Sequence, residues 1–412
     1  MNKGTFGYPG RFRGESFHGF PSKNKQPLFF GFPSGSEVYD FKCDANTANF
    51  AFRITLAAEV GARIVIDKGN GESITRIGTG SNVNIDWTYP QIGKYNINLS
   101  GETSRITGIT INNRRLVGNL SQNFVDKIPN IRVFNIAGNF VSGQLPSFAT
   151  CTALTNFQCY SNQFRGLLPS FSTCTALGTF NCSANQFSGE LPSFATCTAL
   201  VTFYCYANPF SGELPSFSTC TALANFQCYS NQFSGELPSF ASCTALTTFY
   251  CYMNQFSGTL PSFANCTALT NFQCNNNQFS GTLPSFASCT ALTQFLCDAN
   301  QFSGTAPIFN MTIADTQLQM QLNNFTSFEA LIYNFYQNRV LRNSVLNVDL
   351  SGVNNATPSG IFQPPSGYVQ ADTGVSGNDG NPVSAKEQIY VLVNQNVDNS
   401  TTRKYKYLFT TN

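Results

Sequence analysis

The chain has 412 residues, a formal net charge of +2, and charged side chains at only 11% of its positions. This balance provides neither the basic surface that binds nucleic acid nor an acidic tail, so no nucleic-acid partner is expected. Hydrophobic residues make up 42% of the chain and aromatic residues 14%, which is enough to build packed cores. The apolar clusters are too short to cross a bilayer and no apolar signal segment is present, so neither membrane insertion nor Sec-type export is expected.

Residues 1–37 are rich in glycine, phenylalanine and proline and carry several Lys and Arg residues. A segment of this composition cannot close a core of its own. It is either a flexible leader or an anchoring arm whose aromatic side chains dock into a partner and become ordered on assembly. As an arm, it would dock through Phe6, Tyr8, Phe12, Phe17, Phe20, Phe29, Phe30 and Phe32.

Residues 38–104 contain apolar residues at alternating positions, which predicts strands with one buried face and indicates a small β-sandwich. The stretches "IVIDKGNG" and "YPQIGKYNINLSG" resemble the PKD-type β-sandwich module of bacterial surface proteins. Lys68 and Asn70 stand where that module has tryptophan and aspartate, and the segment is short for it.

Residues 105–326 are dominated by a 23-residue repeat that reads L-P-S-F-x-x-C-x-A-L-x-x-F-x-C-x-x-N-x-F-x-G. A fixed period of this length is typical of a solenoid. Within one copy Leu154, Phe157, Cys159 and Phe164 alternate as on the inward face of a strand. The asparagine that follows is expected to turn the chain and to bond freed backbone groups, and the proline is expected to end strand pairing.

The phrase L-x-x-F-x-C-x-x-N-x-F resembles the leucine-rich repeat, and the G-x-L-P stretch after it resembles the plant-specific subtype shortened by one residue. Divergent copies extend the array on both sides, as capping requires. The resemblance implies a mainly β fold, with a leucine-rich-repeat solenoid of about ten repeats built on one parallel sheet. Its strands are expected around residues 109, 134, 157, 180, 203, 226, 249, 272, 295 and 318.

Fourteen of the 15 cysteines fall into two columns, one starting at Cys151 and the other at Cys159. Both columns occupy inward positions, which predicts small, buried, hydrophobic side chains. Disulfides are disfavoured because in-register side chains of parallel strands point the same way. A zinc site is disfavoured because the spacing within a repeat is eight residues and the chain has one histidine, His18. Free thiols are therefore expected, and no metal and no cofactor.

Residues 327–412 are expected to form a C-terminal cap and tail. The segment 327–340 predicts an amphipathic helix with Ser327 as its N-cap, 344–351 predicts a strand, and the last residues predict a β-hairpin. The helix, "LNVDLSG" and "NNATPSG" together resemble the closing segment of leucine-rich-repeat proteins from bacteriophage genomes and Bacteroidetes surface proteins.

Catalysis requires a positioned acid, base or nucleophile, and the repeats offer few such groups. The only histidine lies in the N-terminal segment, and Glu190, Glu213 and Glu236 share one column of return loops, as solvated charges do. No enzymatic activity is expected.

The outward positions of the predicted sheet form a face rich in tyrosine and amide side chains and nearly free of charge. Such a face suits a glycan or a protein ligand, although tyrosine and glutamine ladders also stabilise a sheet by themselves. The candidate ligand-binding residues are Gln158, Tyr160, Asn181, Tyr204, Tyr206, Gln227, Tyr229, Tyr250, Tyr252, Gln273, Asn275 and Asp298.

These observations favour a structural or adhesion protein over an enzyme. The first hypothesis is a bacteriophage virion protein, a fibre, tail component or head decoration, made in the host cytoplasm and acting outside the cell. Its arm would bind other virion proteins and its repeat face a host-surface glycan or protein, with homo-oligomerisation an open possibility. The alternatives are a bacterial cell-surface adhesin, which the PKD-like module suits, and an intracellular scaffold.

Overall fold

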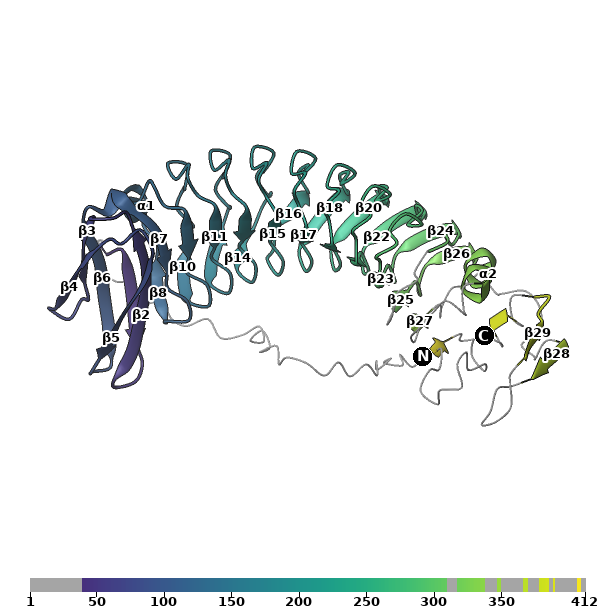
Figure 1. Cartoon of the computed structure of the whole chain (residues 1–412), viewed down its shortest axis with the longest axis horizontal. Coiled ribbons are helices and arrows are strands. Elements are labelled where there is room, and N and C mark those ends of the chain that lie inside the picture. The colour runs from purple at the N-terminus through teal and green to yellow at the C-terminus, as the bar shows by residue number, and fades with distance from the viewer. Residues whose placement is uncertain are drawn as a thin grey trace, which may run out of the picture. The chain divides into compact units, whose positions relative to one another are not determined.

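The computed structural model describes residues 39–309, 317–337, 347–349, 366–369, 378–384, 388–389 and 406–408. The chain divides into two units, Met1–Val38 and Tyr39–Asn412, and all described residues belong to the second unit. The proposed docking arm therefore lies outside the described residues. The described part is mainly β, as the sequence predicts, and consists of a small sandwich that continues into a solenoid (Figure 1).

Six strands form the sandwich, in two sheets. Their alternating apolar residues meet between the sheets, where Ile54 and Ile85 pack with Ile64 and Ile97, all at most 1% exposed. One sheet has the order β4-β3-β6-β1 and the other contains β5 and β2. The strands are β1 (Phe41–Ala45), β2 (Phe50–Ala58), β3 (Arg63–Asp67), β4 (Ser73–Ile77), β5 (Asn82–Tyr89) and β6 (Gly93–Gly101).

Neither sheet of the sandwich ends at the first repeat. Strand β2 pairs with β7 (Ile106–Thr110) and β1 pairs with β8 (Leu116–Asn119), so each sheet runs on into one sheet of the solenoid. Ion pairs cross the same junction, Lys127 Nζ to Asp40 Oδ1 at 2.8 Å and Arg115 Nη2 to Asp44 Oδ2 at 3.0 Å. The sequence did not predict that the sheets are continuous across this junction. The repeat period does not depend on whether a sandwich strand pairs with the first repeat.

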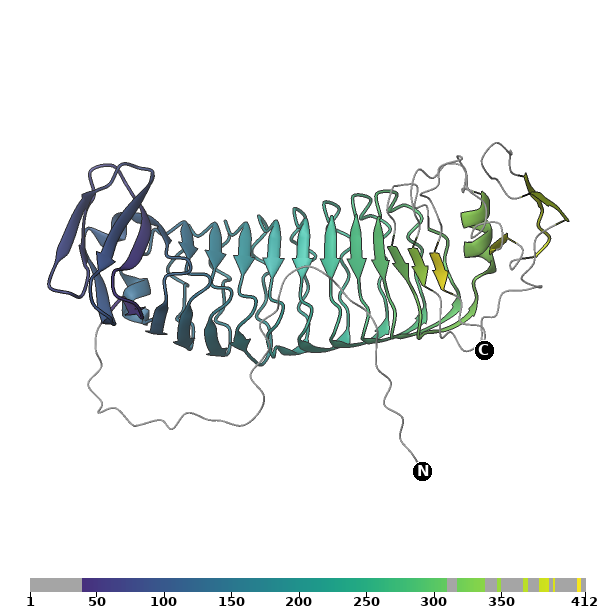
Figure 2. The ribbon, with the colours of Figure 1, turned by 90° about the horizontal axis from the view of Figure 1, so that it is seen from below.

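The main sheet of the solenoid contains one strand from each repeat, and Figure 2 shows these strands side by side. Neighbouring copies pair in parallel and in register, so that Phe157 lies opposite Phe180 and Phe180 opposite Phe203. All ten predicted strands are present. They are β7 (Ile106–Thr110), β9 (Val133–Asn135), β11 (Asn156–Gln158), β13 (Thr179–Asn181), β15 (Thr202–Tyr204), β17 (Asn225–Gln227), β19 (Thr248–Tyr250), β21 (Asn271–Gln273), β23 (Gln294–Leu296) and β25 (Gln317–Gln319).

Each repeat also contributes a second strand, which the sequence analysis did not predict. This strand covers the Q-F-S-G stretch, and its glycine has a positive φ, as in Gly258 with φ +72°. Pairing ends before the Leu-Pro that follows, because proline has no N–H to donate. These strands are β8 (Leu116–Asn119), β10 (Phe140–Gly143), β12 (Gln163–Gly166), β14 (Gln186–Phe187), β16 (Ser211–Glu213), β18 (Gln232–Glu236), β20 (Gln255–Thr259), β22 (Gln278–Thr282), β24 (Gln301–Thr305) and β26 (Asn324–Ser327).

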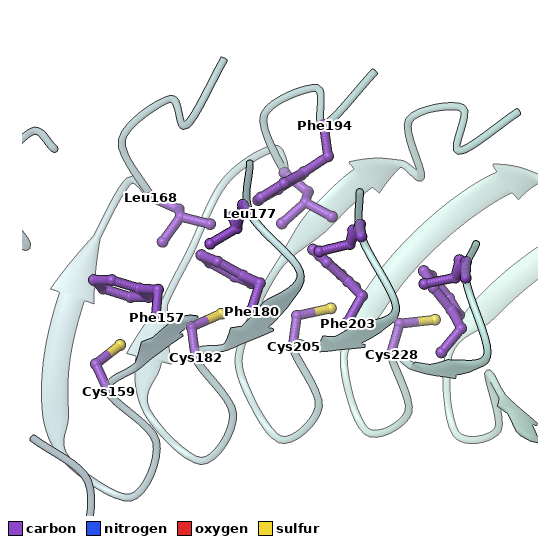
Figure 3. Close-up of a cluster of buried hydrophobic side chains, with 14 of the residues drawn as sticks. Phe157, Cys159, Leu168, Leu177, Phe180, Cys182, Phe194, Phe203, Cys205 and Cys228 are labelled. Atoms are coloured by element: carbon purple, nitrogen blue, oxygen red, sulfur yellow. The ribbon is translucent and has the colours of Figure 1, made fainter. Parts of the chain in front are cut away.

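Phenylalanine rows fill the space between the main sheet and the second strands (Figure 3). Phe157 stacks on Phe180 of the next repeat at a centroid distance of 5.5 Å with an interplanar angle of 14°. It also meets Phe171 of the return segment at 4.9 Å and 59°. Because rings of successive copies are nearly parallel, every inner repeat presents the same surface to its neighbours, and the array can be extended without strain.

An asparagine ladder closes each turn after the main strand. Asn162 donates from Nδ2 to the carbonyl oxygens of Ile136 (2.9 Å) and Cys159 (3.0 Å), and its Oδ1 accepts from Val141 N–H (3.0 Å). One side chain thus bonds its own turn and the previous repeat, which confirms the role predicted for this residue. The ladder consists of Asn139, Asn162, Asn185, Asn208, Asn231, Asn254, Asn277, Asn300 and Asn323.

All 15 cysteines are buried thiols, which confirms the predicted hydrophobic role. In the column that begins at Cys151 the sulfur also donates to a backbone carbonyl, as Cys174 Sγ does to Cys151 O at 3.5 Å. The column that begins at Cys159 lies beneath the main sheet, where Figure 3 shows Cys159, Cys182, Cys205 and Cys228 in line. Burial raises the pKa of the thiols in both columns, and that of Cys197 in the column that begins at Cys151 rises to about 11, so the thiols stay protonated near neutral pH.

The helices are short and lie at the ends of the array. They are η1 (Thr103–Arg105), α1 (Gln122–Asp126) and α2 (Glu329–Gln337). Helix α2 follows Ser327, whose Oγ accepts from Glu329 N–H at 3.3 Å, and it packs Leu331 and Ile332 against the last repeat. Residues 338–340 of the predicted helix lie outside the described residues.

The described residues after α2 include four short strands. Strand β27 (Asn347–Asp349) lies within the predicted strand 344–351 and continues the main sheet. Strand β30 (Lys406–Leu408) pairs in parallel with β27, and most of the hairpin predicted for the last residues lies outside the described residues. Strands β28 (Ser366–Val369) and β29 (Asn378–Asn381) pair with each other in antiparallel fashion.

Candidate functional site

The outward side of the main sheet, here called the open face, lies along the inner edge of the curved array in Figure 1. Because successive repeats pair in register, each outward position of the repeat becomes a straight row across the strands. The candidate residues predicted from sequence lie in two neighbouring rows of this face. The first row is Gln158, Asn181, Tyr204, Gln227, Tyr250, Gln273 and Leu296, and the second is Tyr160, Ser183, Tyr206, Tyr229, Tyr252, Asn275 and Asp298.

Tyrosines dominate both rows on three consecutive strands, β15, β17 and β19. In the second row Tyr206, Tyr229 and Tyr252 form a stack with centroid distances of 4.4 Å and interplanar angles of 6° and 9°. Both faces of the Tyr229 ring are therefore covered by its neighbours. The stack presents ring edges and hydroxyl groups to solvent, and it is a rigid support rather than a free stacking platform.

In the first row, Tyr204 and Tyr250 are separated by Gln227, their common register partner. The Tyr204 ring is tilted by 53° from Tyr206 and the Tyr250 ring by 58° from Tyr252, so the two rings take similar tilts from the stack. No third ring lies between them. We call Tyr204, Gln227 and Tyr250 the tyrosine niche.

Most amide side chains near the niche are already hydrogen-bonded to one another. Gln158 Nε2 donates to Asn156 Oδ1 at 2.9 Å, and Gln273 Nε2 donates to Gln294 Oε1 at 2.6 Å. The Gln227 side chain makes no hydrogen bond within the described residues. It is therefore the amide of this row that is available to a ligand.

Ser183 interrupts the tyrosines of the second row and is fully buried. Its Oγ donates to Asn181 Oδ1 at 2.7 Å, so both side chains are engaged within the sheet. Asn181 was among the candidate binding residues, and this bond leaves it less available than its position in the row suggests. The sequence could not reveal this, since it gives the row of a residue but not its rotamer.

The open face is uncharged across the niche. From β11 to β21 its rows contain tyrosine, serine, threonine, asparagine and glutamine and no ionisable side chain other than tyrosine. Burial is the main cause that raises the pKa of Tyr204, Tyr250 and Tyr252, so their hydroxyl groups are protonated at neutral pH.

Charges lie outside the niche. Asp298 follows β23 in the second row, and Arg53 pairs with Asp86 on the sandwich, with Nε to Oδ1 at 2.6 Å. The glutamate column follows the second strands and does not lie on the open face; Glu213 and Glu236 are the last residues of β16 and β18. A ligand on the niche therefore meets a neutral surface.

The described residues contain no cluster of three or more His, Cys, Asp or Glu side chains that could hold a metal ion. The candidate docking residues of the arm, from Phe6 to Phe32, lie outside the described residues, as does His18. None of the described helices is long and apolar enough to cross a membrane. The chemistry available on the open face is hydrogen bonding and contact with aromatic rings.

Comparison with known proteins supports the architecture. No model of a protein family matches the chain, and no curated protein matches it. Among solved structures it is similar to that of a TDR receptor, with 28% identity and a TM-score of 0.54, over 61% of this chain and 44% of the receptor chain. The chain has the leucine-rich-repeat fold.

Two further solved structures are similar to the chain at lower TM-scores. One is the ectodomain of the plant membrane receptor kinase GASSHO1/SCHENGEN3 from Arabidopsis thaliana, with 21% identity and a TM-score of 0.47, over 59% of this chain and 35% of the other. The second is the functional domain of InlJ from Listeria monocytogenes, with 18% identity and a TM-score of 0.48, over 62% of this chain and 52% of the other. The chain thus spans about half or less of the length of these structures.

Proposed function

We propose that the chain is a non-enzymatic binding protein that attaches to a surface ligand through the open face of its leucine-rich-repeat solenoid. The observation that carries the proposal is the group of five tyrosines on β15, β17 and β19, set on a rigid neutral sheet around the free amide of Gln227. Amphipathic aromatic side chains of this kind supply large contact areas at low entropic cost. The likeness to a receptor structure fits a binding role.

We further propose that this binding occurs on a bacteriophage virion, where the chain serves as a fibre, tail component or head decoration. The ligand would be a glycan or protein of the host surface, and residues 1–37 would anchor the chain to other virion proteins. The C-terminal segment, which resembles that of phage leucine-rich-repeat proteins, supports this setting. So do the buried thiols, which suit folding in a reducing cytoplasm.

A bacterial cell-surface adhesin is the second candidate. The feature that favours it is the sandwich at β1–β6, whose sequence resembles the PKD-type module of bacterial surface proteins. The two candidates use the open face in the same way and differ in where the chain is found.

Mass spectrometry of purified phage particles and of the envelope fraction of the producing cells separates the two settings. The virion proposal expects the chain in particles, and a variant lacking residues 1–37 should be lost from them. A chain found in envelopes and absent from particles would establish the adhesin instead. In either setting, a Tyr204→Ala, Tyr250→Ala double variant should lose attachment to host envelopes, and unchanged attachment would refute a binding role for the open face.

A further inference from the structure

The two tyrosines of the niche are spaced to hold one ring. Tyr204 and Tyr250 lie two strands apart in one row, which corresponds to about 9.6 Å at the usual strand spacing. At this backbone spacing there is room for one ring between the two side chains, in contact with each tyrosine at a centroid distance of about 4.5–7 Å. The Tyr250 ring is also supported from the side by Tyr229, which it meets edge-on at 6.5 Å. The neighbouring stack has no such space, because its rings are 4.4 Å apart.

The floor of the niche offers hydrogen bonds in both directions. The Gln227 amide has two N–H donors and a carbonyl acceptor, and none of them is engaged within the described residues. A hydroxyl group also donates and accepts, so adjacent hydroxyls on one ring match this amide. An aliphatic or aromatic hydrocarbon ring would leave the amide unsatisfied, which costs about 1–3 kcal/mol for a buried polar group.

The charge of the surface selects further among ring-shaped ligands. No ionised side chain lies in the open-face rows from β11 to β21, so a carboxylate or phosphate on the ligand would lose its hydration without gaining an ionic partner. A neutral ligand rich in hydroxyl groups loses the least hydration free energy on transfer to this face, and its hydroxyl groups gain hydrogen bonds there.

We propose that the tyrosine niche binds one pyranose ring of a neutral saccharide, held between Tyr204 and Tyr250 with its hydroxyl groups on the Gln227 amide. This inference rests on the proposed function and names its ligand class. An extended peptide is the competing occupant. Peptides would use the row differently, since backbone groups would need amides along the whole row rather than one amide between two rings.

The experiment measures binding of the full chain to an array of neutral and acidic bacterial surface polysaccharides, together with neutral linear hexasaccharides and uncharged decapeptides. The expected result is binding to neutral saccharides that Tyr204→Ala, Tyr250→Ala and Gln227→Ala each weaken at least tenfold. Tyr204→Phe keeps the ring and should retain most of the affinity. Gln232→Ala is the matched control, because Gln232 is an exposed glutamine of the same repeat that lies on the second strand β18 and not on the open face. It should leave binding unchanged.

Three results would overturn the inference: binding to no neutral saccharide, equal losses for Gln232→Ala and Gln227→Ala, or selective binding of peptides. Circular dichroism and thermal melting of each variant show whether a loss reflects unfolding. Attachment to host envelopes before and after periodate oxidation of their sugars separates this inference from the proposed function. Niche-dependent attachment that survives periodate refutes the saccharide and keeps the binding role, whereas attachment that ignores the niche refutes both.

Discussion

Single asparagine side chains link successive repeats to one another. Asn254 donates to Cys228 O at 3.0 Å and Cys251 O at 3.1 Å, and it accepts from Phe233 N–H at 3.1 Å. Replacement by alanine leaves these backbone groups buried in the turn without a hydrogen-bond partner. We expect Asn254→Ala to lower the free energy of unfolding by about 3 kcal/mol, since each unsatisfied buried group costs about 1–3 kcal/mol.

Urea denaturation followed by circular dichroism measures this effect. Gln255→Ala is the control, because Gln255 is the next residue and its side chain is exposed on β20. Surface substitutions of this kind change stability by about 0.5 kcal/mol or less. Equal shifts in the two variants would show that the asparagine ladder does not hold the turns.

The buried thiols make stability depend on pH. Burial raises the pKa of Cys197 and Cys243 to about 11 and that of Cys266 to about 12, whereas an unfolded thiol titrates near 8.5. The folded chain then holds more protons than the unfolded chain above pH 8.5. The thiols contribute their full stabilisation below that pH, and it is lost as the pH rises toward 11 and 12.

We expect the urea midpoint to be flat from pH 7 to 8 and to fall steeply between pH 8.5 and 9.5, where tyrosine and lysine are still protonated. Each buried thiol contributes up to about 1.4 kcal/mol per pH unit to the slope. Measurements under reducing agent exclude disulfide exchange, and Cys197→Ala should reduce the slope by the share of one thiol. A midpoint that does not change up to pH 9.5 would show that the thiols are not sealed from solvent.

At the scale of the element, the second strand of each repeat depends on a glycine in the left-handed region. Gly258 has φ +72°, and a Cβ there would lie 2.9 Å from Glu236 Cγ. Gly258→Ala should destabilise the chain by about 1–2 kcal/mol, because side chains avoid this conformation. Gly178 is the control, since a Cβ there meets no atom closer than 3.6 Å and the other regular copies, from Thr155 to Thr293, carry Thr, Val or Ala at that position.

Thermal melting of both variants tests this pair. Gly178→Ala should leave the melting temperature unchanged or raise it slightly, because alanine restricts the unfolded chain. If Gly258→Ala were as harmless as Gly178→Ala, the second strand would not require its glycine.

Strands and helices could be predicted from sequence where a repeating pattern of apolar residues indicated them. The main strands follow from Leu-x-x-Phe-x-Cys and their ends from the asparagine, and both are found as predicted. The second strands were missed because Q-F-S-G has one apolar residue and no visible alternation. The short helix α1 was missed because its sequence, QNFVD, spans little more than one turn.

At the scale of the whole molecule, the sequence placed the candidate residues together on one face of the main sheet but could not rank them. In-register repeats convert a position in the period into a row, so the rows of Gln158 and Tyr160 were predictable. Ring stacking and hydrogen-bond partners depend on rotamers of neighbouring copies. Only the structure therefore shows that the Tyr229 ring is covered on both faces and the Tyr204 ring is not. It likewise shows that the Gln273 amide is hydrogen-bonded and the Gln227 amide is free.

The repeat architecture allows the site to be separated from the fold by deleting one copy. Removing residues 237–259 eliminates β19 with Tyr250, so Gln227 gains Gln273 as its neighbour and the niche loses one wall. Removing residues 260–282 deletes β21 instead and leaves Tyr204, Gln227 and Tyr250 in place. Both deletions span one 23-residue period and restore the same register, so both chains should fold with similar melting temperatures.

Saccharide binding by the two deletion variants then reports on the niche alone. We expect the chain without residues 260–282 to bind neutral saccharides within about threefold of the full chain, a difference of about 0.6 kcal/mol. The chain without residues 237–259 should bind at least tenfold more weakly, because no ring can be held from both sides. Equal binding by two folded variants would mean that affinity depends on the length of the open face and not on the tyrosines at its centre.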